Sequence, residues 1–350
     1  MADKMLTLDG SYGEGGGQIL RTSLALALIT GRGFHLHNLR AKRKNPGLAR
    51  QHMACLQAAA ILGEAETQGV NLGSQEIVFC PRRPMAHIAA GAEWHFEVPS
   101  AGSAMLLLQT LLFPLAQRGG RLRVKGGTHN PMAPPFDFLT NTFFPLLARM
   151  GLTADAELIR PGFCPAGGGE AVFVIAPCLR PSPLALLQRG KVRNIRAVAY
   201  ISRLPAHIAG RELAVIGKRL DISPENLRTV VARDAAGAGN VAAVFLDCEE
   251  VSETFTAFGV KGVRAEKVGL AAANEAQQWL KADVPVGPYL ADQLLLPCAL
   301  AGGGEFRTMA PTAHSRTNAW VISKFLDIKT EFIPQADGSW LVRVKTVAAN

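Results

Sequence analysis

The spacing of hydrophobic and polar positions changes several times along the first hundred residues, and it predicts alternating strands and helices. Short stretches in which apolar and polar residues alternate are typical of half-buried strands, whereas longer stretches with apolar residues three and four apart are typical of helices. Turn-forming residues, mostly glycine, separate the stretches. The pattern predicts strands over residues 5–10, 34–39, 75–80 and 93–98 and helices over residues 18–31 and 52–63. The first unit therefore has the order βαβαββ.

The same order of elements recurs twice more in the chain. The second unit has predicted helices over residues 100–120 and 136–151 and strands over residues 121–127, 152–159 and 170–176. The third has predicted helices over residues 286–304 and 318–326 and strands over residues 305–310, 326–333 and 339–346. Asn45 and Pro46 in the first unit correspond to Asn130 and Pro131, 85 residues further on. Units of this length indicate packed subdomains rather than a solenoid, whose repeats are about 20–50 residues long.

Residues 184–281 do not repeat this pattern. They predict a strand, a helix, three strands and a second helix, which is enough for a small α/β domain. Segments that contain proline border the region on both sides. We therefore expect an α/β protein of the α+β kind, with a discontinuous catalytic domain of three βαβαββ repeats (residues 1–183 and 282–350). The inserted domain, residues 184–281, is expected between the second and third repeats.

Composition indicates a folded protein with a basic surface. Hydrophobic residues make up 48% and charged residues 19% of the 350 residues, and no apolar run reaches the about 18 residues of a membrane span. The first ten residues lack the core of a signal peptide, so we expect a cytoplasmic protein without a membrane partner. The six cysteines form no CxxC pair, which argues against a zinc site and a disulfide framework. The net charge of +9 favours polyanionic partners such as nucleic acid or ATP.

The glycine-rich stretch GEGGGQILR connects the first predicted strand to the first predicted helix. It matches neither the dinucleotide-binding pattern nor the P-loop pattern, but free N–H groups at a helix N-terminus favour an anion. Glu14 would repel a bare phosphate, so its presence indicates a divalent cation between the carboxylate and the phosphates. Gln18 and Arg21 share a helix face that can reach over the loop. The alternative is a tight turn that needs glycine only for its backbone.

A basic loop before the second helix is another candidate anion site. Its polar residues are Arg40, Lys42, Arg43, Lys44, Arg50, Gln51 and His52. Guanidinium groups bind phosphate oxygens in a bidentate manner. The turn formed by Asn45, Pro46 and Gly47 suggests that these side chains have a defined direction. The alternative is a solvated charged loop.

The later units contribute five further polar candidates. Gln109 is a polar residue within an otherwise apolar helix, and Tyr289, Asp292 and Gln293 are residue types that stack on a base or hydrogen-bond a ribose. His314 lies in a predicted loop that corresponds to the Asn-Pro loops of the first two units. A neutral imidazole is a nucleophile at physiological pH and can attack phosphorus to form a phosphoramidate. Each of these residues, taken singly, also has an ordinary structural explanation.

Taken together and in order, these stretches resemble the RNA 3′-terminal phosphate cyclases. The resemblance rests on GEGGGQILR, the loop from Arg40 to His52, SAGS with Gln109, GGTHNPMAPP, GFCPAGGG, YLADQ, and the His314 loop ahead of TN. It covers nearly the whole chain. It implies the family fold of three βαβαββ repeats, which resembles half of an enolpyruvyl transferase, with a small α/β insert.

The resemblance also implies a mechanism of the ATP-dependent ligase class. A histidine attacks the α-phosphorus of ATP and expels pyrophosphate, and the AMP then moves to the 3′-phosphate of an RNA. The neighbouring 2′-OH attacks the 3′-phosphorus, AMP leaves, and a 2′,3′-cyclic phosphate remains. The implied cofactors are ATP and a divalent metal, Mg²⁺ or Mn²⁺, and the implied partner is an RNA with a 3′-terminal phosphate.

The resemblance assigns roles to individual residues. His314 matches the adenylated histidine of the family, and Glu14 matches the carboxylate on the metal side. The residues that match ATP-site positions are Gln109, Pro131, Tyr289, Leu290, Ala291, Asp292 and Gln293. The residues that match ligands of the triphosphate or of the RNA-end phosphate are Gln18, Arg21, Arg40, Arg43, Gln51 and His52. Their division between the two phosphates stays open, and His129 receives no role.

Two other functions are weighed against this one. A non-catalytic RNA-binding factor of ribosome assembly would have the same fold without the nucleophilic histidine, so the presence of His314, Glu14 and YLADQ argues against it. An enolpyruvyl transferase would share the plan of the repeats and a basic loop. That function predicts six repeats, whereas the pattern of this chain indicates three.

Overall fold

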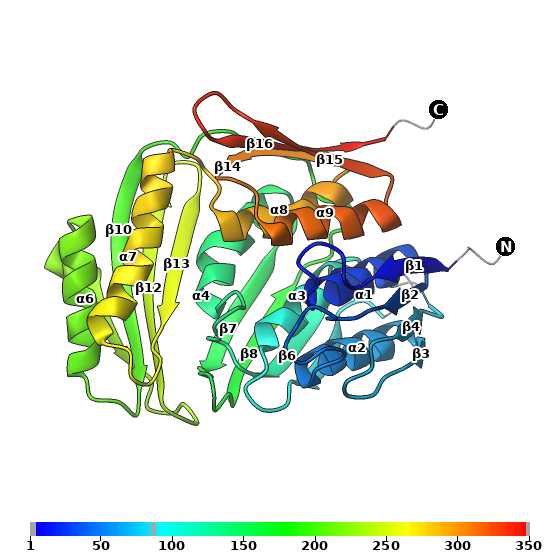
Figure 1. The fold of residues 1–350 in the computed structure, drawn as a ribbon, viewed down its shortest axis with the longest axis horizontal. Helices are drawn as coiled ribbons and strands as arrows, with labels where there is room; N and C mark the ends of the chain where they lie inside the picture. The colour runs from blue at the N-terminus through cyan, green and yellow to red at the C-terminus, as the bar shows by residue number, and fades with distance from the viewer. Residues whose placement is uncertain (1–4, 84, 86–88, 348–350) are drawn as a thin grey trace.

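The computed structural model describes residues 5–83, 85 and 89–347 and contains four sheets of four strands each. Residues 1–4 of the segment considered for a signal peptide lie outside this range. Figure 1 shows three sheets around a group of central helices, with the fourth sheet and its two helices at one end of the molecule. Within the described residues, every helix is too short or too polar to cross a membrane.

The first unit has the expected order of elements, with one strand that the sequence pattern does not predict. Its elements are β1 (Leu6–Asp9), α1 (Gln18–Thr30), β2 (Phe34–His37), α2 (Arg50–Gly63), β3 (Glu66–Gln68) and β4 (Ile77–Cys80). β1 and β2 are parallel, which requires a crossover through α1, and β4 and β3 follow as antiparallel neighbours. The unpredicted strand is β3, because three mostly exposed residues are too few to show a period.

The second unit repeats this topology. Its elements are β5 (Ala92–Glu97), α3 (Ala104–Ala116), β6 (Gly120–Gly126), α4 (Phe136–Phe138), the π-helical turn η2 (Leu139–Phe143), α5 (Phe144–Arg149), β7 (Ala154–Arg160) and β8 (Gly169–Ile175). The sequence analysis assigns the strand near residues 93–98 to the first unit, but β5 pairs in parallel with β6. Alternation reveals a strand and not its partner, which explains the wrong assignment.

The third unit begins before the inserted segment. Its elements are β9 (Leu184–Leu186), α8 (Pro288–Leu300), β14 (Gly303–Thr308), α9 (Ala313–Phe325), β15 (Ile328–Pro334) and β16 (Trp340–Thr346). The sequence analysis places residues 184–186 in the insert, whereas the structure pairs β9 with β14 in the third sheet. The insertion therefore interrupts the third unit after its first strand. A strand of three residues carries no pattern that could reveal so distant a partner.

The inserted segment forms its own sheet with two helices. Its elements are β10 (Val192–Ser202), α6 (His207–Leu220), β11 (Leu227–Val231), β12 (Gly239–Cys248), β13 (Ser252–Phe258) and α7 (Ala265–Ala282), with a 3₁₀ turn, η3 (Pro224–Asn226). The strand order is β11-β10-β12-β13. Helices α6 and α7 cover one face of this sheet, as Figure 1 shows, and β13 also contacts α4 and η2 of the second unit.

Helix α1 occupies the centre of the three repeated units. It packs against α2, α3 and α9, and most of its residues are buried. A helix that is apolar nearly all round belongs in a protein interior. Gln18 and Thr22 are exceptions, because they are polar and yet less than 9% exposed. These two side chains therefore need hydrogen-bond partners on neighbouring elements.

A buried carboxyl group joins the insert to the third unit. Glu253 of β13 accepts hydrogen bonds from the backbone N–H groups of Gly287 (2.5 Å) and Thr254 (3.3 Å). Burial raises the pKa of Glu253 to about 8, although both hydrogen bonds lower it. The folded protein therefore keeps this proton at pH values at which the unfolded chain has released it.

We expect this carboxyl group to make folding stability fall as the pH rises. The stabilisation is fully present below the ordinary glutamate pKa of about 4.3 and is lost as the pH rises through the folded pKa of about 8. Glu253→Gln imitates the protonated form and should flatten this part of the profile. Thermal unfolding of both proteins across this pH range measures the difference. Parallel profiles of Tm against pH would contradict the assigned pKa.

Candidate active site

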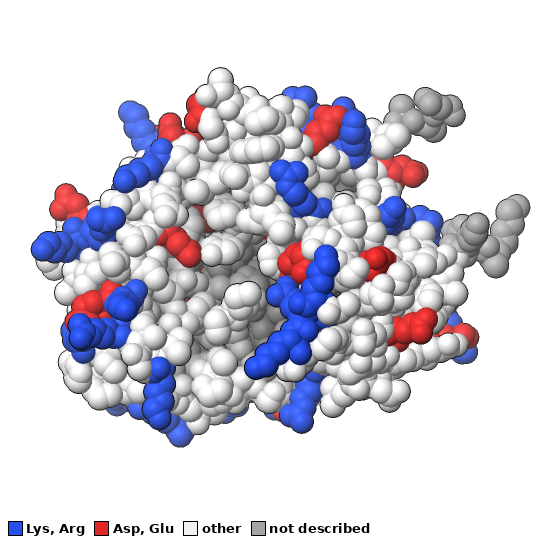
Figure 2. All heavy atoms as spheres, viewed as in Figure 1, with Lys and Arg blue, Asp and Glu red and all other residues white. Residues whose placement is uncertain are grey.

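A cavity of about 660 Å³ lies where the three units and the insert meet. Figure 2 shows a hollow in this face of the molecule, with Lys and Arg side chains along one side of it. All but two of the site residues that the resemblance assigns line the cavity, whereas Lys42, Lys44 and Arg50 of the basic loop do not. The lining residues are Glu14, Gln18, Arg21, Arg40, Arg43, Gln51, His52, Gln109, Pro131, Tyr289, Asp292, Gln293 and His314. The fold thus brings together residues from all three units.

The two exceptions are Leu290 and Ala291, which the sequence analysis places in the ATP site. They are 0% and 2% exposed and belong to the hydrophobic core. Tyr289, Asp292 and Gln293 line the cavity, because residues three and four apart share one face of α8. A contiguous motif of five residues cannot all face one side of a helix, so the middle two point into the core.

His314 lies in the first turn of α9 rather than in a loop. Thr312 is the N-cap of this helix, and its Oγ1 accepts a hydrogen bond from the backbone N–H of Ser315 (3.1 Å). The sequence analysis starts the helix at residue 318 because polar residues hide the apolar period of the first turn. The regular backbone of the helix thus fixes the position of the Cα atom that carries the imidazole, which lines the cavity.

Gln18 connects His314 to a buried carboxyl group. The Nε2 group of Gln18 donates to Oδ1 (2.6 Å) and Oδ2 (2.8 Å) of Asp292, which leaves its Oε1 facing Nδ1 of His314 at 2.9 Å. Asn318 donates to Asp292 Oδ1 (3.1 Å) and accepts from the hydroxyl of Thr22 (2.8 Å). Because Oε1 of an amide only accepts, Nδ1 of His314 must carry the proton in the neutral ring. The lone pair of His314 is then on Nε2.

The surroundings of His314 favour its neutral form. Burial lowers the pKa of His314, the charges of Arg21 and Arg43 lower it further, and Asp292 partly opposes them. Its Nε2 atom lies 3.8 Å from Oε1 of Glu14 and its side chain is 46% exposed, so a substrate in the cavity can approach it. The neutral ring thus has its proton on Nδ1 and a lone pair on Nε2.

Three arginines create a positive region beside His314. Burial lowers the pKa of His52 to about 3, and the charges of Arg21, Arg40 and Arg43 add to the effect. His52 is therefore neutral, and its Nδ1 atom is buried without a partner among the described residues. Arg40 also donates to the carbonyl oxygen of Gly47 (2.7 Å), which ties the basic loop into a defined turn. The potential of this region suits phosphate groups.

The glycines of the first loop leave space for neighbouring side chains. A Cβ atom on Gly16 would overlap the carboxylate of Glu14, and one on Gly17 would lie 1.9 Å from Nε2 of His52. A larger residue at either position would have to displace these side chains from the cavity. Side chains, rather than a bare backbone, occupy the space beside this loop.

Glu14 has an incomplete set of partners. Its Oε1 atom pairs with Arg43, while Oε2 is buried without a hydrogen-bond partner among the described residues. The described residues contain no group of three or more His, Cys, Asp or Glu side chains that could hold a metal by themselves. Glu14 thus fits a single carboxylate ligand of Mg²⁺, which usually takes its other ligands from water and substrate phosphates.

The insert supplies part of the cavity wall that sequence reasoning missed. Thr254, Thr256 and Phe258 are alternate residues of β13 and line the cavity. Elsewhere in the lining, the side chains of Gln109 and Gln293 hydrogen-bond to one another. The sequence predicts the strand β13, but nothing in it shows that one face of this strand meets a cavity of the other units.

Comparison with known protein families assigns this architecture. The family model described as RNA 3′-terminal phosphate cyclase matches residues 12–332. An RNA 3′-terminal phosphate cyclase of Ectopseudomonas mendocina is 44% identical over 332 residues, which cover 94% of this chain and 95% of that protein. The protein of the same name from Koribacter versatilis is 44% identical over 93% of this chain and 91% of its own length. That from Salmonella typhimurium is 41% identical over 97% and 99%, respectively.

The chain belongs to the RNA 3′-terminal phosphate cyclase family. The resemblance stated from its motifs is thereby confirmed, and so is the expected class of enzyme. The mixed α/β fold is confirmed as well. In this cyclase-family chain, residues carried over from the motifs surround one cavity, which is the candidate active site.

We expect His314 to titrate below the ordinary histidine pKa of about 6.5 and to carry its proton on Nδ1 when neutral. Long-range proton–nitrogen NMR spectra of isotope-labelled protein distinguish the two tautomers. Gln18→Leu removes the acceptor at similar volume, so a mixture of tautomers should appear in that variant. A wild-type spectrum with the proton on Nε2 would overturn the assigned orientation of the Gln18 amide.

Proposed function

We propose that this chain converts an RNA 3′-terminal phosphate to a 2′,3′-cyclic phosphodiester in an ATP-dependent reaction through a covalent His314–AMP intermediate. The observation that carries the proposal is the fixed orientation of His314, whose Nδ1 faces the Gln18 amide oxygen at 2.9 Å while Nε2 is free. This nitrogen lies in a cavity with several arginines. Nucleophile and anion-binding groups are therefore within reach of one triphosphate.

The reaction proceeds in three steps. The lone pair on Nε2 of His314 attacks the α-phosphorus of ATP, the bond to the bridging oxygen breaks, and pyrophosphate leaves with the electron pair. An oxygen of the RNA 3′-phosphate then attacks the same phosphorus and displaces the histidine. Finally the 2′-OH attacks the 3′-phosphorus and loses its proton, while AMP leaves with the electron pair. The last step requires a ribose with a free 2′-OH at the RNA end.

The cavity residues divide by chemistry into two groups. The residues for the adenosine part of ATP are Gln109, Pro131, Tyr289, Asp292 and Gln293, which are polar or can stack on a base. The residues for the phosphates of ATP and of the RNA end are Arg21, Arg40, Arg43, Gln51 and His52. Gln18, which the sequence analysis places among them, instead orients His314, because Asp292 and His314 occupy both ends of its amide. Glu14 would hold a divalent cation, Mg²⁺ or Mn²⁺, that neutralises charge on the triphosphate when bound.

Incubation with Mg²⁺ and ATP labelled at the α-phosphate should yield an acid-labile protein–AMP adduct. His314→Ala should abolish both this adduct and RNA cyclisation, because it removes the nitrogen that the proposal assigns as the attacking atom. A suitable control is His207→Ala, since His207 is an exposed histidine at the start of α6. Adduct formation by His314→Ala would overturn the nucleophile. An RNA 3′-phosphate that is bound but never cyclised would favour the binding factor instead.

Glu14→Gln should raise the Mg²⁺ concentration needed for half-maximal adenylation by roughly tenfold, which corresponds to about 1.4 kcal/mol. This substitution removes the negative charge that would bind the cation and leaves the side-chain volume nearly unchanged. Saturating Mg²⁺ should restore most of the rate. An unchanged Mg²⁺ dependence would show that Glu14 serves only as the partner of Arg43.

A further inference from the structure

Two walls of the cavity are attached to the inserted subdomain, residues 192–282. One wall is the loop of residues 130–136, which carries Pro131, and the other is the start of α8, which carries Tyr289. The walls come from different units, the second and the third. In each case a side chain of the insert makes the attachment.

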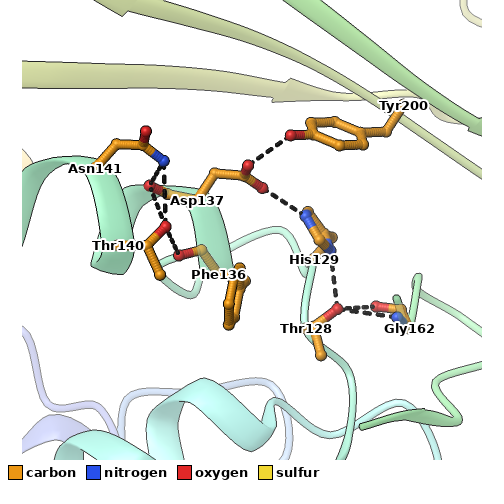
Figure 3. Close-up of polar contacts among 8 residues, drawn as sticks. All are labelled: Thr128, His129, Phe136, Asp137, Thr140, Asn141, Gly162 and Tyr200. Carbon is orange, nitrogen blue, oxygen red and sulfur yellow. Dashed lines mark hydrogen bonds and ion pairs between the residues drawn. The ribbon is translucent and has the colours of Figure 1, made fainter. Parts of the chain in front are cut away.

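The first attachment is a buried hydrogen-bond network, drawn in Figure 3. Nε2 of His129 lies 2.8 Å from Oδ2 of Asp137, so the two residues flanking the loop are joined to one another. The backbone N–H of Phe136 also donates to the carbonyl oxygen of Thr128 (3.0 Å). Tyr200 of β10 then donates its hydroxyl to Oδ1 of Asp137 (2.5 Å) from the side of the insert. The base of the loop is thus closed and connected to the insert.

The chemistry of this network makes it persistent at physiological pH. Burial would raise the pKa of Asp137, but hydrogen bonds from His129 and Tyr200 lower it overall. Burial and the nearby Asp137 charge raise the pKa of Tyr200 above its ordinary value, so its hydroxyl stays a donor. His129 is 1% exposed, and its Nδ1 lies 2.8 Å from the hydroxyl of Thr128. Each of the three side chains therefore has a partner.

The second attachment holds the start of α8. Glu253 of β13 accepts the backbone N–H of Gly287, the N-cap of that helix, at 2.5 Å. A Cβ atom on Gly287 would lie 2.7 Å from Oε1 of Glu253, so a larger residue would have to displace this carboxyl group. Glu275 of α7 accepts a hydrogen bond from the hydroxyl of Tyr289 (3.2 Å). Both carboxyl groups belong to the insert, and both hold the helix that carries Tyr289.

A single rigid sheet links the two attachments. β10 and β13 both pair with β12, with Tyr200 opposite Val241 and Glu253 opposite Leu246. The hydrogen bonds of this sheet thus fix the separation between Tyr200, which holds the loop, and Glu253, which holds the helix.

We propose that the inserted subdomain sets the separation of the two cavity walls that receive the nucleotide, with Tyr200, Glu253 and Glu275 as its positioning residues. The inference rests on the proposed ATP-dependent function. None of the three positioning residues lines the cavity, so each acts through Pro131 or Tyr289. Loss of one attachment leaves His314 and the arginines in place and weakens binding of the adenine base of ATP. It should therefore change ATP affinity and base selectivity more than the rate of the chemical step.

The test compares full-length variants that each lose one hydrogen bond. Tyr200→Phe removes the hydrogen bond of the insert to the loop, and Glu275→Leu removes the acceptor that holds the hydroxyl of Tyr289. The matched controls are Tyr12→Phe, which alters a half-exposed tyrosine outside the cavity, and Glu266→Leu, which alters an exposed carboxylate on the same helix as Glu275. Single-turnover adenylation with labelled ATP gives the half-saturating ATP concentration and the maximal rate. The same assay with GTP gives base selectivity, and thermal unfolding verifies folding.

Each positioning variant should raise the half-saturating ATP concentration about threefold to tenfold, the effect of losing one hydrogen bond. The maximal rate should stay within about twofold, and the preference for ATP over GTP should fall. Both controls should match the wild type. Unchanged half-saturation and selectivity in the positioning variants, with a wild type that forms the adduct, would overturn the inference and leave the proposed function intact. A reduced maximal rate with unchanged half-saturation and selectivity would also overturn the inference and leave the proposed function intact. A wild type that binds no ATP would overturn both.

Discussion

The hydrogen bonds of Gln18 are the interaction on which the candidate active site depends. This side chain reaches from the buried helix α1 to Asp292 and His314 on the third unit, at distances of 2.6–2.9 Å. Asp292 and His314 are 274 and 296 residues away from Gln18 in the chain. Because an amide has one donating and one accepting end, the carboxylate at one end decides which nitrogen of the imidazole is free at the other. Packing of the first unit against the third thus determines the chemistry of His314.

The charges around this centre are arranged so that a phosphate group can complete them. Arg43 pairs with Glu14, but Arg21 has no carboxylate contact among the ion pairs of the described residues. Arg21 is partly exposed and lines the cavity, so its guanidinium group can pair with an anion there. The two histidines in this region are neutral, because burial and the nearby guanidinium charges lower the pKa of His52 and of His314. The site is therefore cationic through its arginines, while the ring of His314 is neutral.

The repeated topology and the position of the insertion together explain why four parts of the chain share one cavity. Each unit has the same strand order, so corresponding loops and helix starts lie at corresponding edges of the sheets. The insertion enters the third unit between β9 and α8, and its last helix, α7, ends at Ala282 just before α8 begins at Pro288. The insert is consequently placed beside the helix that carries Tyr289 and, through β10, beside the Pro131 loop of the second unit.

The sequence by itself determined the local elements, the three repeats and the set of motifs, because periodicity, turn residues and motif order are properties of neighbouring positions. It also indicated site residues that, apart from Leu290 and Ala291, do line the cavity, but it missed the wall that the insert supplies. Only the tertiary structure decided which residues of YLADQ face the cavity, since Leu290 and Ala291 point into the core. The same is true of the partner of β9, the tautomer of His314 and the attachments made by Tyr200 and Glu253. Each of these depends on contacts between distant segments, and a local pattern cannot show where a segment packs.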